Sequence, residues 1–250
     1  ILAGTSEATA LAQLIEEHPL LSGTMSLAGR TRQPAPTALP QRQGGFGGPA
    51  GLADYLREHA FDALVDATHP FAARISANAA QAAAQAGLPL AALVRPPWEA
   101  AAADHWIGAA SVTDAAEALR PLGRNVLVTT GRQELAPYER VPDKHYVIRT
   151  IDPPEPPPDL PHATYVQERG PFAPEAEAAL MAQHGIEVLV SKNSGGTATR
   201  SKLDAARERG IPVVMVERPA RPEGVPVFHE PSAVMQWLED RPNPDYSAPR

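Results

Sequence analysis

Short apolar runs and alanine-rich segments alternate along the whole chain. The apolar runs are rich in Val, Ile, Leu and Ala, and several are continuous rather than interrupted by polar residues. Continuous runs of this kind are typical of strands that helices cover on both faces of a parallel sheet. We therefore predict strands at 1–4, 25–29, 63–68, 90–95, 126–130, 146–149, 164–167, 186–191 and 213–217.

The segments between these strands have helical periodicity. Ala8, Leu11, Ala12 and Ile15 follow the i, i+3, i+4, i+7 spacing of one apolar helix face, and Ser6 is a suitable N-cap. Strands that alternate with helices predict an α/β fold with parallel sheets. Further helices are predicted at 72–86, 112–119, 174–183, 199–209 and 232–238.

The second half of the chain repeats the first in the same order. Gly4 and Glu7 recur as Gly131 and Glu134, the run at 62–65 recurs at 187–190, and Gly-Leu-Pro at Gly87 recurs as Gly-Ile-Pro. Chance similarity is the alternative, because Gly-Leu/Ile-Pro is a common turn from helix to strand. The repeat favours a gene duplication.

We expect this duplication to give two Rossmann-like parallel-sheet domains, at 1–122 and 123–250, with the helices at 112–119 and 232–238 closing the two halves. Ligands of open α/β sheets bind outside the carboxyl ends of the strands. We therefore expect a ligand cleft between the two domains, formed by residues that directly follow strands.

Two turns in the first half suit a dinucleotide. The turn Gly4, Thr5, Ser6 and Glu7 follows the first strand, where a helix N-terminus binds a pyrophosphate. It lacks the G-x-G-x-x-G pattern, so a simple N-cap turn is the alternative. Gly29, Arg30 and Thr31 follow the second strand, where the ribose is recognised, and an arginine there favours the 2′-phosphate of NADPH. A solvated arginine is the alternative.

Two further segments of the first half are candidates. The glycine-rich segment 44–48 includes Gly45 and suits either close backbone approach to a ligand or a flexible lid. Thr68 and His69 end the third strand, where we expect both to face the cleft and Thr68 to bind the cofactor. His69 is our candidate proton donor, because imidazole titrates near neutral pH, and a hydrogen-bonded turn histidine is the alternative.

In the second half, cations and small polar residues gather at the predicted strand ends. Their side chains and backbone amides suit anions, and several cations facing one cleft favour a polyanionic ligand. A set of scattered, solvated residues is the alternative. The candidate substrate-binding residues are Arg132, Arg149, Arg169, Ser191, Lys192, Asn193, Ser194, Gly195 and Lys202, together with Gly45.

Composition narrows the function further. The net charge of −7 disfavours nonspecific binding to nucleic acid, which depends on basic patches. The chain has no cysteine, so thiol catalysis, disulfides and cysteine-ligated metals are excluded. No apolar run is long enough to span a membrane, and no signal peptide opens the sequence. Histidines lack ligand spacing, so we expect no metal site, and we expect a cytoplasmic protein.

The combined motifs resemble the precorrin-6A reductase family of cobalamin biosynthesis. The similar segments are ILAGTSEA, DATHPFAARISANA, RPPWE, VLVTTGRQEL, VIRTIDPPEPP, ERGPF, VLVSKNSGGTATRSKLDAAR and GIPVVMVERP. The resemblance extends from residue 1 to residue 219. It implies NADPH-dependent reduction of the C18=C19 double bond of precorrin-6A to give precorrin-6B. The substrate that it implies is a ring with many acetate and propionate arms.

Several points stay open in the sequence. Either half is suited to hold the cofactor phosphates, and the substrate is either the metal-free ring or its cobalt-containing counterpart. Two other functions also fit two Rossmann-like halves. One is a nucleotide-sugar transferase, and the other is a nucleotide-binding sensor without turnover.

Overall fold

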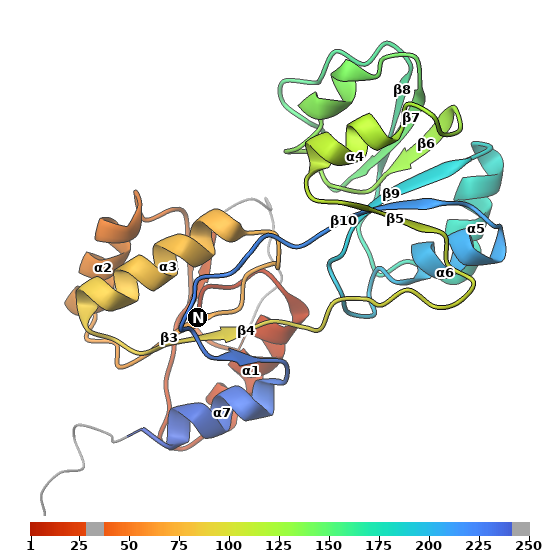
Figure 1. Cartoon of the computed structure of the whole chain (residues 1–250). Coiled ribbons are helices and arrows are strands. Elements are labelled where there is room, and N and C mark those ends of the chain that lie inside the picture. The colour runs from red at the N-terminus through yellow and green to blue at the C-terminus, as the bar shows by residue number, and fades with distance from the viewer. Residues whose placement is uncertain (29–37, 242–250) are drawn as a thin grey trace, which may run out of the picture. The chain divides into compact units, whose positions relative to one another are not determined.

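A computed structural model describes residues 1–28 and 38–241, and it divides the chain into two compact units (Figure 1). Unit 1 consists of Ile1–Pro96 together with Ala220–Arg250, and unit 2 consists of Pro97–Pro219. The division differs from the expected boundary between residues 122 and 123. The strand order in each unit explains the difference.

Unit 1 contains a parallel sheet in which Leu2 links two smaller sheets. Leu2 forms isolated parallel bridges to Ser26 and to Asp66. The strands are β1 (Met25–Leu27), β2 (Gln41–Gln43), β3 (Leu64–Asp66), β4 (Leu90–Leu93) and β11 (Val227–Phe228). Their order is β2-β1-Leu2-β3-β4-β11, which is the Rossmann order 3-2-1-4-5-6. The order therefore reverses between Leu2 and β3.

Helices cover both faces of the unit 1 sheet (Figure 1). On one face, α1 (Ser6–Glu17) and α7 (Pro231–Glu239) pack against Val65 and Leu93. On the other face, α2 (Pro49–Glu58) and α3 (Ala73–Ala86) pack against Leu2 and Leu64. Neighbouring strand residues such as Leu64 and Val65 are thus both buried, which accounts for the continuous apolar runs.

Unit 2 has the same strand order. All its strands are parallel, in the order β8-β7-β6-β9-β10-β5. They are β5 (Trp106–Ala109), β6 (Asn125–Val128), β7 (His145–Thr150), β8 (Ala163–Gln167), β9 (Val188–Lys192) and β10 (Val213–Val216). The helices of this unit are α4 (Val112–Ala118), the 3₁₀ helix η1 (Ala136–Arg140), α5 (Pro174–Gln183) and α6 (Ser201–Glu208). With β6 as the first strand, the order reverses between β6 and β9.

The two units exchange their sixth strand and last helix. After β4, the chain leaves unit 1 and supplies β5 and α4 to unit 2. After β10, it returns and supplies β11 and α7 to unit 1, where β11 pairs with β4. The helices at 112–119 and 231–239 therefore each close the other half, not their own. This exchange places the divisions after Pro96 and Pro219, rather than at residue 122.

Candidate functional site

Two loops flank the point in unit 1 where the strand order reverses. Thr5 follows Leu2 and caps α1, because its Oγ1 accepts a hydrogen bond from the Ala8 N–H at 3.2 Å. The same hydroxyl donates to the Ala67 carbonyl, after β3, at 2.9 Å. The N-cap is thus Thr5 rather than the expected Ser6, and its hydroxyl joins the two loops.

The first turn of α1 offers both backbone donors and a carboxylate. Helix geometry leaves the first N–H groups of α1 without intrahelical partners, which favours an anion at this end. Glu7 forms an ion pair with Arg95 at 3.4 Å and accepts a hydrogen bond from the Ser6 hydroxyl at 3.2 Å. A carboxylate in this position suits the hydroxyls of a ribose better than a phosphate.

Sequence reasoning missed a buried carboxylate beside the predicted Thr68. Asp66, at the end of β3, is 2% exposed and accepts hydrogen bonds from Thr68, Ser76 and Arg221. Arg221 belongs to the segment that returns from unit 2. An acidic residue at the end of an apolar run was the only signal in the sequence, and its arginine partner is 155 residues away.

His69 lies in the turn between β3 and α3. Its Nδ1 accepts a hydrogen bond from the Phe71 N–H at 3.3 Å, and its carbonyl accepts one from the Ala72 N–H at 2.7 Å. When the ring is neutral, its proton is therefore on Nε2. This geometry combines the turn histidine with an Nε2–H that is able to donate a hydrogen bond.

The other predicted residues of unit 1 follow β1 and β2. The Gly45 carbonyl accepts a hydrogen bond from Arg42 Nη2 at 3.3 Å, and the Arg42 guanidinium lies 3.9 Å from the centre of the Phe46 ring. Gly45 therefore belongs to a turn that Arg42 holds in place. Gly29, Arg30 and Thr31 lie outside the described residues.

At the carboxyl ends of the unit 2 strands, two predicted cations face carboxylates. Lys192, at the end of β9, forms an ion pair with Glu134 in the loop after β6. This pair spans the reversal of strand order in unit 2. Arg132 lies 3.8 Å from the Asp152 carboxylate and donates to the Pro153 carbonyl at 3.3 Å. Arg169 follows β8 and is exposed.

The loop after β9 holds the segment by which the chain enters unit 2. The Asn193 side chain accepts from the Trp98 N–H at 2.7 Å and donates to the Trp98 carbonyl at 3.0 Å. The Trp98 indole donates to the Gly196 carbonyl at 2.7 Å. Lys202 is buried, with Nζ 5.4 Å from the centre of the Trp98 ring. Asn193 and Lys202 therefore contribute to packing around Trp98.

Other members of the predicted set are also buried. Ser191, Ser194 and Gly195 lie in the loop itself or at the end of β9, and the Ser194 carbonyl accepts a hydrogen bond from Arg218 at 3.0 Å. Arg149 pairs with Glu177 at 2.7 Å, and its guanidinium lies 3.8 Å from the centre of the Phe172 ring. Arg149 is thus part of the core of unit 2.

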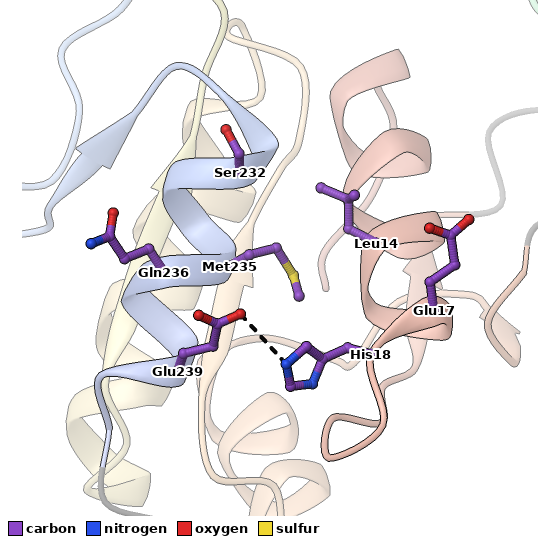
Figure 2. Close-up of a pocket in the computed structure, with 7 residues that line it drawn as sticks. All are labelled: Leu14, Glu17, His18, Ser232, Met235, Gln236 and Glu239. Atoms are coloured by element: carbon purple, nitrogen blue, oxygen red, sulfur yellow. Dashed lines mark ion pairs between the residues drawn. The ribbon is translucent and has the colours of Figure 1, made fainter.

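A separate pocket of about 450 Å³ lies between α1 and α7 (Figure 2). His18 and Glu239 approach each other there at 3.5 Å, beside Leu14 and Met235. None of the predicted site residues lines it. Within residues 1–28 and 38–241, no group of three or more His, Asp or Glu side chains is arranged to hold a metal ion. No helix in the same ranges is long and apolar enough to cross a membrane.

Comparison with known proteins decides the family. A family model described as "Precorrin-6x reductase CbiJ/CobK" matches residues 1–239. The chain belongs to this family. A solved structure titled "CobK precorrin-6A reductase" superposes with a TM-score of 0.89 at 42% identity, covering 96% of this chain and 94% of that one. The resemblance drawn from the sequence is confirmed, and so is the α/β fold with parallel sheets.

Individual relatives of the precorrin-6x reductase family differ in their similarity to this chain. The precorrin-6A reductase of Rhodococcus erythropolis is 47% identical over 241 residues, which is 95% of this chain and 96% of that protein. The cobalt-precorrin-6A reductase of Priestia megaterium is 31% identical over 182 residues, which is 67% of this chain and 69% of that protein. As a member of this family, the chain is an oxidoreductase.

Proposed function

We propose that this chain reduces a carbon–carbon double bond of precorrin-6A with NADPH, giving precorrin-6B in cobalamin biosynthesis. The observation that carries the proposal is the match to the precorrin-6A reductase of Rhodococcus erythropolis over nearly the full length of both chains. The weaker and shorter match to a cobalt-precorrin-6A reductase favours the metal-free ring as substrate.

The residues at the strand reversal of unit 1 fit a dinucleotide. Gly4, Thr5 and Ser6 form a turn from the first strand into α1, where amides favour the pyrophosphate. Glu7 is suited to ribose hydroxyls. The 2′-phosphate is assigned to Gly29, Arg30 and Thr31 from the sequence alone. When bound, NADPH supplies the hydride, so the protein needs only to position the cofactor and the ring and to exclude water.

The substrate carboxylates are assigned to the exposed or half-buried cations of unit 2. Arg132, Arg169 and Lys192 all lie at the carboxyl ends of its strands. Substrate carboxylates would replace Glu134 and Asp152 as partners of Lys192 and Arg132. Arg149, Asn193 and Lys202 leave the proposed set, because their side chains are committed to Glu177 and Trp98.

His69 is the proposed proton donor. Hydride transfer to one carbon of the double bond leaves the other carbon to take a proton. The imidazolium form of His69 is the proposed source, because it gives up one proton from Nε2 and becomes a neutral ring. Formation of the imidazolium requires Nδ1 to give up the hydrogen bond that it accepts from the Phe71 N–H. His69→Ala should lower kcat about 10²-fold or more if this proton transfer limits the rate. An unchanged kcat across the pH range removes the assignment and makes solvent the source.

The cofactor assignment is tested with Arg30→Ala. Its KM for NADPH should rise by about tenfold or more while its KM for NADH stays close to that of the wild type, since only NADPH carries the 2′-phosphate. Arg57→Ala is the matched control, because Arg57 lies on the surface of α2 in the same unit. Equal changes with both cofactors contradict the assignment.

The reaction itself is tested with purified precorrin-6A and its cobalt-containing counterpart. Loss of NADPH absorbance with the metal-free ring supports the proposal. NADPH binding without turnover of either ring indicates a sensor, and binding of a nucleotide sugar in place of NADPH indicates a transferase.

A further inference from the structure

The Asp66 carboxylate is the centre of a buried hydrogen-bond network in unit 1. Oδ1 accepts from the backbone N–H and the hydroxyl of Thr68, at 3.1 and 2.6 Å. Oδ2 accepts from the Ser76 hydroxyl at 2.6 Å and from Arg221 Nη2 at 2.7 Å. Four donors, one of them a guanidinium, thus surround a carboxylate whose side chain is 3% exposed.

This network fixes the direction of the Thr68 hydroxyl. A hydroxyl has one proton to donate, and a carboxylate paired with a guanidinium only accepts. The Thr68 proton is therefore directed to Asp66, and Oγ1 presents only lone pairs to any further partner. Thr68 consequently suits an N–H or O–H donor, whereas a phosphate oxygen requires donors.

Thr68 directly follows β3, at the strand reversal where we place the dinucleotide. Two groups of a nicotinamide nucleotide are donors of the right kind: the carboxamide N–H and the ribose hydroxyls. The phosphates are therefore excluded as partners of the Thr68 hydroxyl. The position of Thr68 alone would allow them, because Leu2, which precedes the Gly4–Ser6 turn, is next to β3 in the sheet.

We propose that Asp66 and Arg221 are positioning residues that hold Thr68 as a hydrogen-bond acceptor for a carboxamide or ribose donor of the cofactor. The proposal rests on the proposed function. Arg221 belongs to the segment that returns from unit 2, so the acceptor is complete only when this segment is in place on unit 1.

The test measures cofactor affinity in the full-length chain by nicotinamide fluorescence, together with the urea midpoint of each variant. Thr68→Val should weaken NADPH binding about tenfold, the value of one hydrogen bond, and Thr68→Ser should restore it. Arg221→Met should also weaken binding, and Arg221→Lys should recover most of it. Arg57→Met, which removes an exposed arginine of the same unit, is the control and should bind as the wild type does.

A merely structural role predicts a different pattern. Thr68→Val and Arg221→Met would then lower the urea midpoint and leave the affinity of the folded protein unchanged, which overturns the proposal. If the wild type itself fails to bind NADPH, the proposed function fails as well, so the two failures are distinguishable.

The oxidised 3-acetylpyridine analogue of NADP, whose affinity is measured by its displacement of fluorescent NADPH, identifies the donor, because it lacks the carboxamide N–H. If the carboxamide is the donor, Thr68→Val should bind this analogue as tightly as the wild type does. If a ribose hydroxyl is the donor, the tenfold loss persists with the analogue. Both results support an acceptor role for Thr68.

Discussion

Arg149 and Glu177 form an ion pair whose side chains are only 6% and 1% exposed. Glu177 Oε2 is buried and has no hydrogen-bond partner among the described residues. Burial removes both charges from water, so the pair itself contributes little net stability, but the loss of one partner leaves an uncompensated charge. Substitution of one partner alone should therefore destabilise the core of unit 2.

Arg149→Met should lower the free energy of unfolding by about 3–5 kcal/mol, and the double variant Arg149→Met, Glu177→Leu should recover most of the loss. Urea denaturation measures both effects. Arg200→Met is the control, because Arg200 pairs with Asp204 on the surface, where ion pairs contribute little. A stable double variant with a raised KM for the precorrin would support the original prediction that Arg149 binds the substrate.

Two tyrosines make the stability of unit 2 sensitive to alkali. The rings of Tyr138 and Tyr146 pack with their centres 5.5 Å apart, and burial raises the pKa of both phenols. The unfolded chain therefore releases these protons at a lower pH than the folded chain does. Stability should be complete below about pH 10 and should fall as the pH rises above it.

Above that pH, each buried tyrosine should lower the free energy of unfolding by up to about 1.4 kcal/mol per pH unit. Urea titrations across the alkaline range measure the slope. The double variant Tyr138→Phe, Tyr146→Phe should show a shallower slope, even though it loses the hydrogen bond from Tyr146 to the Val141 carbonyl. An unchanged slope would mean that other groups cause the alkaline loss.

The sequence predicts site positions from their place after buried strands, but it does not predict the partners of these residues. Thr5, Thr68 and Lys192 follow buried strands, and that placement is readable from the apolar runs. Asp66 was not recognised, because its importance depends on Arg221, which approaches only through the exchanged segment. Arg149 resembled a ligand-binding strand-end arginine, and its burial against Glu177 depends on how α5 packs.

At the scale of elements, three strands of the described residues escaped prediction: β2, β5 and β11. β2 consists of Gln41, Arg42 and Gln43, with no apolar residue, and β11 contains only two residues. All three lie at sheet edges, where one neighbour is enough to define the strand, whereas β8 also lies at an edge but was predicted. Pairing with that neighbour, rather than local sequence, determines β2 and β11. The central strands were predicted because both their faces are buried.

The exchanged helix α4 is held to unit 2 by a buried lysine. Lys144 is 4% exposed, and its ammonium donates to the carbonyls of Leu122 at 2.8 Å and Arg120 at 3.3 Å. These carbonyls lie in the turn that follows α4, before β6. A cation at the end of a helix also stabilises the helix dipole.

Lys144→Met should lower the free energy of unfolding by about 2–4 kcal/mol, because two charge-assisted hydrogen bonds are lost and two carbonyls lose a partner. Denaturation followed by circular dichroism measures the change. Arg209→Met removes an exposed cation at the end of α6 and should have little effect. Equal effects of the two substitutions would show that the buried contacts are not the cause.

At the scale of the whole molecule, the internal repeat agrees with the strand order that the two units share, but it could not reveal the exchange. The order of repeated motifs along the chain is the same whether each half keeps its sixth strand or gives it to the other. Only the pairing of β5 with β10 and of β11 with β4 distinguishes the two arrangements. Both arrangements bury the same apolar residues, so composition and periodicity do not separate them.

The exchange predicts which pieces of the chain fold alone. Residues 97–219 contain all six strands of unit 2 and should unfold cooperatively in urea. Residues 123–250 should not, because they lack β5 and carry α7 without α1, which exposes Val234 and Met235. Residues 1–96 joined to 220–241 by a flexible linker should also fold, whereas 1–122 should not. Cooperative unfolding of 1–122 and 123–250, without that of 97–219, would mean that each half keeps its own sixth strand.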